Sequence, residues 1–113
     1  MQTNAQANVA DSPIQSEALK DNQFRVAAAP PGSALLVADA SVFNVAGSFC
    51  ATHAKCTHRG GPLNEGKLDG STVTCPWHGS QYNVCTGAVL RGPATEPVKT
   101  YRVIVEGEIG RVE

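Results

Sequence analysis

Two pairs of cysteine and histidine constrain this chain of 113 residues more than any other feature. Cys56 and His58 form a Cys-x-His pair, and Cys75 and His78 form a Cys-x-x-His pair. The chain has only four cysteines and three histidines, so the pairs contain half of the former and two of the latter. Thiolate and imidazole are ligands of zinc and of iron–sulfur clusters. The pairs therefore predict a metal site.

Glycine and proline are concentrated around these pairs, which is typical of loops that turn side chains inward. These residues are Gly60, Gly61, Pro62, Gly66, Gly70, Pro76 and Gly79. Short apolar runs separated by turn residues lie on both sides and predict strands. The predicted strands cover about 24–28, 34–38, 42–46, 49–52, 88–92 and 99–113. Because no long helical period occurs, the predicted class is all-β.

The last predicted strand region has the clearest alternation. Tyr101, Val103 and Val105 alternate with Arg102 and Ile104, as in a strand with one buried face.

The polar N-terminus has a different character. Residues 1–22 lack periodicity and predict a flexible extension, with a short helical stretch near Ser16–Lys20. A partner-docking arm is the alternative interpretation. Residues 23–113 are then the single folded domain.

Composition excludes several classes of function. The formal net charge is −1 and lysine and arginine do not cluster, so binding to nucleic acid has little support. No apolar run approaches the ~20 residues of a membrane helix. The N-terminus has neither the basic nor the apolar region of a secretory signal. We expect a soluble, cytoplasmic monomer, in which thiols stay reduced and a disulfide scaffold is disfavoured.

Two kinds of metal site agree with the four ligands. One is a single tetrahedral zinc ion, although zinc motifs usually pair cysteine with cysteine and histidine with histidine. The other is a two-iron cluster with both cysteines on one iron and both histidines on the other. The mixed pairs favour the iron cluster.

The motifs themselves resemble a known family. The segments "CTHRGGPLNEG" and "CPWHGSQY" are similar to the two boxes of Rieske proteins, and the similarity extends over about Phe24–Glu113. The resemblance implies an antiparallel β sandwich or partial barrel with a loop-rich cluster-binding subdomain at about 54–83. It also implies one [2Fe–2S] cluster per chain, with Cys56 and Cys75 on the buried iron and His58 and His78 on the outer iron.

Formal charge gives a physical reason for the mixed ligands. Two ferric ions and two sulfides are doubly positive, so four thiolates make the oxidised site doubly negative, whereas two thiolates and two neutral imidazoles make it neutral. An added electron therefore enters a less negative site, and the potential rises by hundreds of millivolts. The imidazoles stay titratable, which predicts proton uptake on reduction.

The resemblance also assigns roles to residues near the ligands. Ser80 and Tyr82 occupy positions where high-potential Rieske proteins have hydroxyl donors to sulfur, which raise the potential. In the alternative interpretation Ser80 caps a turn and Tyr82 is a core residue. The residues predicted to cover the cluster are Gly60, Gly61, Pro62, Trp77, Gly79, Gly92 and Pro93. For Trp77, simple loop packing is the favoured role.

Rieske proteins of the cytochrome bc complexes have an extra cysteine in each box, and the two form a disulfide. Those positions here are Gly61 and Trp77, so the chain resembles the ferredoxin and oxygenase branch instead.

The remaining cysteines and histidine match no ligand position. We expect Cys50 to be a small buried side chain, Cys85 to lie beside a turn, and His53 to be a surface or strand residue. A Cys50–Cys85 disulfide is the disfavoured alternative. Charged residues near the boxes are read as ordinary solvated charge, or alternatively as a mildly basic rim for an acidic partner. They are Lys55, Arg59, Lys67 and Arg91, offset by Glu65 and Asp69.

These features predict a one-electron carrier that passes electrons from a reductase to a terminal oxygenase or similar acceptor. It is not itself an oxygenase, because His53 alone remains for the 2-His-1-carboxylate iron site that such enzymes need. One alternative is the small subunit of an assimilatory nitrite reductase. The other, from a different class, is a structural zinc module that binds partner proteins.

Overall fold

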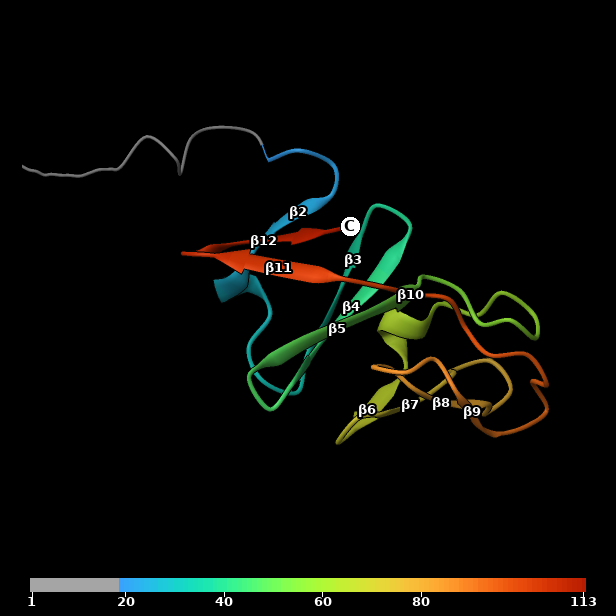
Figure 1. Cartoon of the computed structure of the whole chain (residues 1–113). Helices are drawn as coiled ribbons and strands as arrows, with labels where there is room; N and C mark the ends of the chain where they lie inside the picture. The colour runs from blue at the N-terminus through green and yellow to red at the C-terminus, as the bar shows by residue number, and fades with distance from the viewer. Residues whose placement is uncertain (1–18) are drawn as a thin grey trace, which may run out of the picture.

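The computed structural model describes residues 19–113, which form three antiparallel sheets and contain no α-helix (Figure 1). The first sheet has the order β10-β5-β4-β3 and is made of Thr100–Tyr101, Ser48–His53, Ala40–Val45 and Ala34–Val37. The second sheet has the order β11-β12-β2 and is made of Val103–Glu106, Ile109–Val112 and Gln23–Arg25. The predicted all-β class is confirmed.

A third sheet lies at the other end of the molecule (Figure 1). It has the order β6-β7-β8-β9 and is made of Lys67–Asp69, Thr72–Thr74, Gln81–Asn83 and Val89–Arg91. A short 3₁₀ helix, η3 (Leu63–Glu65), precedes it. This sheet carries the second Cys/His pair on the connection between β7 and β8.

Two apolar cores hold the sheets together. The first two sheets share a core that contains Phe24, Val42, Ala51 and Val112. The other core joins the first sheet to the third, and its members are Phe43, Cys56, Leu63, Val73, Cys75, Tyr82, Val84, Ala94 and Val98. Both paired cysteines therefore lie inside the core between these two sheets.

Strands are present in the predicted ranges 34–38, 42–46, 49–52, 88–92 and 99–113, and two other predictions need correction. The strand predicted at 24–28 ends at Arg25, because Val26–Ala28 form a 3₁₀ helix, η2. The predicted loop region around the pairs contains the short strands β6, β7 and β8. Their three-residue lengths leave too little alternation for a sequence pattern to register.

The alternation predicted for Tyr101, Val103 and Val105 holds only in part. Tyr101 and Val103 pack against the same core, but Val105 is 46% exposed. Val105 lies in the same strand as Val103, but the last two residues of β11, next to the turn at Gly107, are exposed.

The predictions of a flexible extension and of a helical stretch near Ser16–Lys20 concern residues that lie almost wholly outside the described part. Leu19 and Lys20 are described and are not helical. Asn22 is fastened to β12, since its side chain donates to Val112 O at 3.0 Å and its own carbonyl accepts from Val112 N at 2.8 Å. Within residues 19–113, there is no helix with the length and apolar character needed to cross a membrane.

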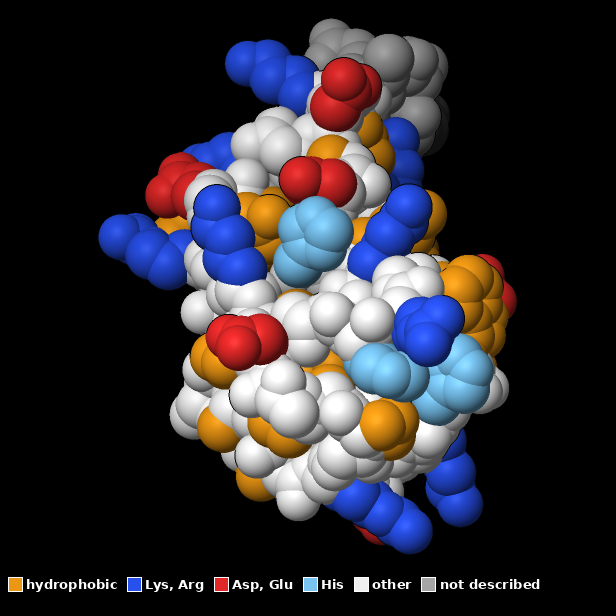
Figure 2. Space-filling view, turned by 90° about the vertical axis from the view of Figure 1, so that its right-hand side faces the viewer, with side chains coloured by type: hydrophobic (Ala, Val, Ile, Leu, Met, Phe, Trp, Pro, Cys, Tyr) orange, Lys and Arg blue, Asp and Glu red, His pale blue; other side chains and the backbone are white. Residues whose placement is uncertain are grey.

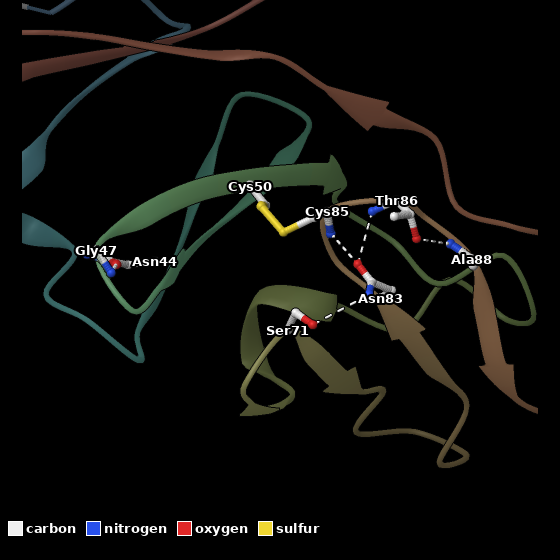
Figure 3. The surroundings of a disulfide bond; sticks show 8 residues. All are labelled: Asn44, Gly47, Cys50, Ser71, Asn83, Cys85, Thr86 and Ala88. Carbon is white, nitrogen blue, oxygen red and sulfur yellow. Dashed lines mark hydrogen bonds between the residues drawn. A yellow bond between two sulfur atoms is a disulfide. The ribbon is translucent and has the colours of Figure 1, made fainter.

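Cys50 and Cys85 form a disulfide, so the expectation of two separate thiols is wrong (Figure 3). Cys50 lies on β5 in the first sheet, and Cys85 lies on the turn after β8 in the third. The fold brings their Cα atoms to 5.0 Å, although they are 35 residues apart. Sequence spacing contained no sign of this approach. We call this bond the inter-sheet disulfide.

Candidate metal centre

The two Cys/His pairs lie on loops with the same backbone hydrogen bonds. Cys56 N donates to Gly61 O at 2.8 Å, and Gly60 N donates back to Cys56 O at 2.9 Å. In the second loop Cys75 N donates to Ser80 O at 2.8 Å, and Gly79 N donates back to Cys75 O at 3.1 Å. Each loop thus closes on its own cysteine.

Glycine is required at the same point of both loops. Gly60 has a φ of 77° and Gly79 a φ of 83°, in the left-handed region that other residues adopt at a cost. This shared geometry explains why glycine recurs after each histidine, although the two pairs differ in spacing.

The two kinds of ligand lie in different surroundings. Cys56 and Cys75 are buried free thiols, with exposed fractions of 5% and 3%. His58 is half-buried and His78 is exposed, and their rings lie edge to face with centroids 5.2 Å apart. Figure 2 shows adjacent histidine side chains at the molecular surface. The structure therefore brings all four predicted ligands into one region, with the sulfurs inside and the imidazoles outside.

Hydrogen bonds favour the thiolate form of Cys56. Burial by itself raises the pKa of its thiol, but bonds from the Tyr82 hydroxyl and from the N–H groups of His58 and Arg59 lower the pKa below its ordinary value. At Cys75 burial is the stronger effect, so its pKa lies above the ordinary value despite the N–H groups of Trp77 and His78.

Tyr82 joins the second loop to the first. Its hydroxyl is fully buried and lies 2.9 Å from Cys56 Sγ, 3.2 Å from Thr57 N and 3.0 Å from Thr57 Oγ1. Burial and the bond to Cys56 raise the pKa of Tyr82, and its hydroxyl lies within hydrogen-bond distance of the sulfur, to which it can donate. The core position and the donor geometry, which were alternatives in the sequence, are both present.

We expect Tyr82→Phe to lower the midpoint potential by about 50 mV. A hydrogen bond to a charged group contributes about 1.5–3 kcal/mol, and the part that grows when the sulfur gains charge sets the potential. For a one-electron couple, about 59 mV corresponds to a tenfold change in equilibrium. Redox titration measures the shift, with Tyr101→Phe, a half-buried tyrosine in the other core, as the matched control. Equal midpoints in Tyr82→Phe and the unaltered protein would show that the hydroxyl has no tuning role.

Ser80 connects the second loop to the segment that follows β9. Its side chain is fully buried, and its Oγ accepts a hydrogen bond from Ala94 N at 3.0 Å. Ala94 belongs to the core that contains both paired cysteines, whereas Gly92 and Pro93 are exposed. Ser80 therefore holds the 92–94 segment against the candidate site.

Gly61 and Trp77 lie in contact between the two loops. A Cβ atom added at Gly61 would lie 2.5 Å from Cys75 Sγ and 3.1 Å from Trp77 Cγ. Trp77 therefore lies against the buried Gly61, yet its side chain remains 57% exposed. Of the other covering residues, Pro62 pairs with Lys55 in a β-bridge at the end of the first loop.

Thr57 has a positioning role that the sequence analysis missed. Besides its contacts with Tyr82, its hydroxyl donates to Glu96 O at 2.8 Å, which fixes the first loop to the segment before β10. The only available sign was a hydroxyl residue between the paired Cys56 and His58. His53 lies at the end of β5, where its Nδ1 accepts from Lys55 N at 3.3 Å, and it lines the same cavity as Cys56.

A family model of the Rieske [2Fe-2S] domain matches residues 14–102. The chain belongs to the Rieske [2Fe-2S] domain family. Its cofactor is therefore a Rieske-type [2Fe–2S] cluster, and this membership replaces the zinc alternative. This Rieske protein is an electron-transfer protein.

Named relatives of this Rieske protein are ferredoxins. Ferredoxin CarAc of Metapseudomonas resinovorans is 44% identical over 61% of this chain, and the match spans 65% of that ferredoxin. The 3-phenylpropionate/cinnamic acid dioxygenase ferredoxin subunit of Escherichia coli (strain K12) is 43% identical over 73% of this chain, and the match spans 81% of that subunit.

A solved structure gives the same result for the fold. The structure is the complex of reduced oxygenase and oxidized ferredoxin in carbazole 1,9a-dioxygenase. One of its chains has 34% identity and a TM-score of 0.72, and the match covers 79% of this Rieske protein and 96% of that chain.

The residues of the site fit the cluster that the family implies. Two thiols and two imidazoles supply the mixed donor set, and Cys56 and Cys75 are free of the disulfide. His58 Nδ1 is buried and, among the side chains of residues 19–113, is the buried nitrogen or oxygen atom that lacks a hydrogen-bond partner. A metal bond at this nitrogen would satisfy it.

Proposed function

We propose that this Rieske protein carries single electrons from a reductase to a terminal oxygenase, with Cys56 and Cys75 on the inner iron and His58 and His78 on the outer. The observation that carries the proposal is the separation of the ligands by exposure. The thiols lie in the core between two sheets, and the imidazoles lie at the surface. A partner protein that docks over the histidines would bring its own redox centre within a short electron-transfer distance of the cluster.

When bound, the cluster supplies a one-electron couple. The residues around it hold the ligands in place and exclude water from the sulfurs. Tyr82 and Thr57 fix the first loop, and Ser80 fixes the 92–94 segment, which we propose covers the site. Donors aimed at Cys56 Sγ stabilise negative charge on that sulfur, so the same contacts that fix the loop favour the added electron.

The surface around the histidines suits a protein partner. Trp77 is exposed next to His78, and tryptophan is enriched among the residues that dominate binding energy at interfaces. A cavity of about 460 Å³ lies beside Cys56 and includes Lys55, Glu96 and Lys99 in its wall. The solved oxygenase–ferredoxin complex of a similar protein supports an oxygenase as the acceptor.

Charge on this surface suggests an acidic partner. Lys55, Arg59 and Arg91 are exposed and form no salt bridge with any of residues 19–113. Lysine and arginine side chains flank the histidines on the face drawn in Figure 2. An acidic docking surface would therefore associate faster at low salt than at high salt.

The same proposal places the protein in the cytoplasm as a monomer, with residues 23–113 as the Rieske domain and a cluster-binding part at about 54–83. Among the alternatives, the named ferredoxin relatives favour an oxygenase system over the small subunit of a nitrite reductase.

We expect Trp77→Ala to slow electron transfer to a Rieske terminal oxygenase by about tenfold, because loss of an interface tryptophan costs more than about 1 kcal/mol. Stopped-flow spectroscopy at limiting protein concentration measures the rate. The matched control is Leu36→Ala, which removes a side chain with 58% exposure from β3 in another sheet. The docking surface is elsewhere if the two variants transfer electrons at the same rate while the midpoint potential of Trp77→Ala is unchanged.

A further inference from the structure

We propose that the inter-sheet disulfide is a thiol-exchange site, at which a dithiol reductant separates the first and third sheets and so weakens retention of the cluster. This inference is independent of which reductase or oxygenase the protein serves. It depends on the place of Cys50 and Cys85 in the fold, their accessibility, and the structure of the turn that carries Cys85.

The disulfide joins the two strands that position the candidate metal site. Cys50 lies on β5, and the chain leads from the end of this strand directly to Cys56. Cys85 lies just after β8, the strand that contains Tyr82. The bond between Tyr82 and Cys56 therefore spans the same two parts of the chain as the disulfide. Loss of the covalent link leaves these parts joined by the core and by hydrogen bonds.

The two sulfurs differ in access. Cys85 is exposed, whereas Cys50 is half-buried and packs against the core that contains both candidate ligand cysteines. Cys85 is therefore the more accessible half of the bond for a thiol in solution, and attack there makes Cys50 the leaving group. Exchange rates depend on such access as well as on the attacking thiolate.

The turn that presents Cys85 does not depend on the disulfide for its shape (Figure 3). Asn83 Oδ1 accepts hydrogen bonds from Cys85 N at 2.9 Å and from Thr86 N at 3.0 Å. Gly87 N donates to Asn83 O at 2.7 Å, and Asn83 Nδ2 donates to Ser71 Oγ at 3.4 Å. These bonds lie within the third sheet and its turn, so they remain after reduction. Cys85 then stays in position, which makes the exchange reversible.

The chemistry balances as a two-electron exchange with a dithiol. One thiolate of the dithiol attacks Cys85 Sγ, forms a mixed disulfide and releases Cys50 as a thiolate, which takes up a proton. The second thiolate of the dithiol then attacks the other sulfur of the same dithiol molecule, which is bonded to Cys85 in the mixed disulfide. Cys85 leaves as a thiolate and is protonated, and the dithiol departs as a cyclic disulfide. Two electrons pass to the protein sulfurs, separately from the one-electron couple of the cluster.

The test treats the full-length, cluster-loaded protein with dithiothreitol and then with iodoacetamide. We expect Cys50 and Cys85 to become alkylated, as peptide mass spectrometry shows, while the visible absorption of the cluster is still present. Cluster loss on warming, followed by the fall of that absorption, should then be about tenfold faster than in the untreated protein, since a disulfide of this kind restrains the open chain. In a separate portion that is reduced but not alkylated, reoxidation with oxidised glutathione should restore the slow rate.

A variant separates this effect from attack of dithiothreitol on the cluster. The double variant Cys50→Ser/Cys85→Ser should lose its cluster at the fast rate with or without dithiothreitol. Two results would overturn the proposal. One is a disulfide that resists dithiothreitol as long as the cluster is bound. The other is a reduced protein that keeps its cluster as long as the oxidised protein does.

Discussion

Gly61→Ala is expected to remove the cluster from most of the protein. The added methyl group would lie 2.5 Å from Cys75 Sγ, closer than a Cβ atom approaches such a neighbour, and 3.1 Å from Trp77 Cγ, which is a tight contact. The loops must then move apart, and Gly61 O is also the acceptor for Cys56 N. Overpacking of this kind costs about 1–3 kcal/mol, which is roughly a 5- to 150-fold loss in cluster retention. Iron and sulfide analysis of the purified variant measures the effect.

Gly107→Ala is the matched control for this variant. It adds the same methyl group at a position with a φ of 64° and no heavy atom within 4 Å. The left-handed backbone costs about 1 kcal/mol there, but it has no connection with the ligand loops. Its iron content should equal that of the unaltered protein. A fully loaded Gly61→Ala protein would contradict the close approach of the two loops.

Reduction of the inter-sheet disulfide is expected to lower the free energy of unfolding by about 3–4 kcal/mol, from the entropy that a cross-link removes from a loop of 35 residues. For a domain of about 100 residues, each kcal/mol shifts the melting temperature by about 4–8 °C. The reduced protein should therefore melt on the order of 15 °C lower at a fixed scan rate. The oxidised and reduced forms have the same sequence, so this comparison does not depend on a substitution.

Cys85→Ser provides the second arm of that comparison. Without a reductant it should melt close to the reduced protein, and a reductant should lower its melting temperature no further. Melting temperatures that agree within a few degrees for oxidised and reduced protein would show that core packing alone joins the two sheets.

Much of the site could be predicted from the sequence, because the chemistry is local. The residue types of the pairs Cys56/His58 and Cys75/His78 show which donor atoms are available. The formal charge of the cluster follows from those residue types alone. Gly60 and Gly79 mark the left-handed residues that close each loop. The all-β class followed from short apolar runs between turn residues. These features depend on neighbours in sequence, where a pattern is visible.

The rest depends on contacts between distant parts of the chain. Nothing near Ser80 indicates that it accepts a hydrogen bond from Ala94 N, and nothing near Thr57 indicates its bond to Glu96 O. The disulfide was disfavoured because a reducing cytoplasm disfavours disulfides in general, whatever the positions of the two cysteines in the fold. In the structure, β5 and the turn after β8 bring Cys50 and Cys85 together. Strands of three residues, such as β6, β7 and β8, are fixed by pairing rather than by their own sequence.

The mixed ligand set is the central claim, and histidine nitrogen coupling tests it most directly. The His53→Gln variant is produced with ¹⁵N-labelled histidine, and the purified protein is then reduced and studied by pulsed EPR. Only His58 and His78 then carry the label, because His53 is the third and last histidine of the chain. We predict strong coupling from both labelled histidines to the same reduced cluster, with two irons and two sulfides per chain. Coupling from one histidine or from neither would contradict the assignment.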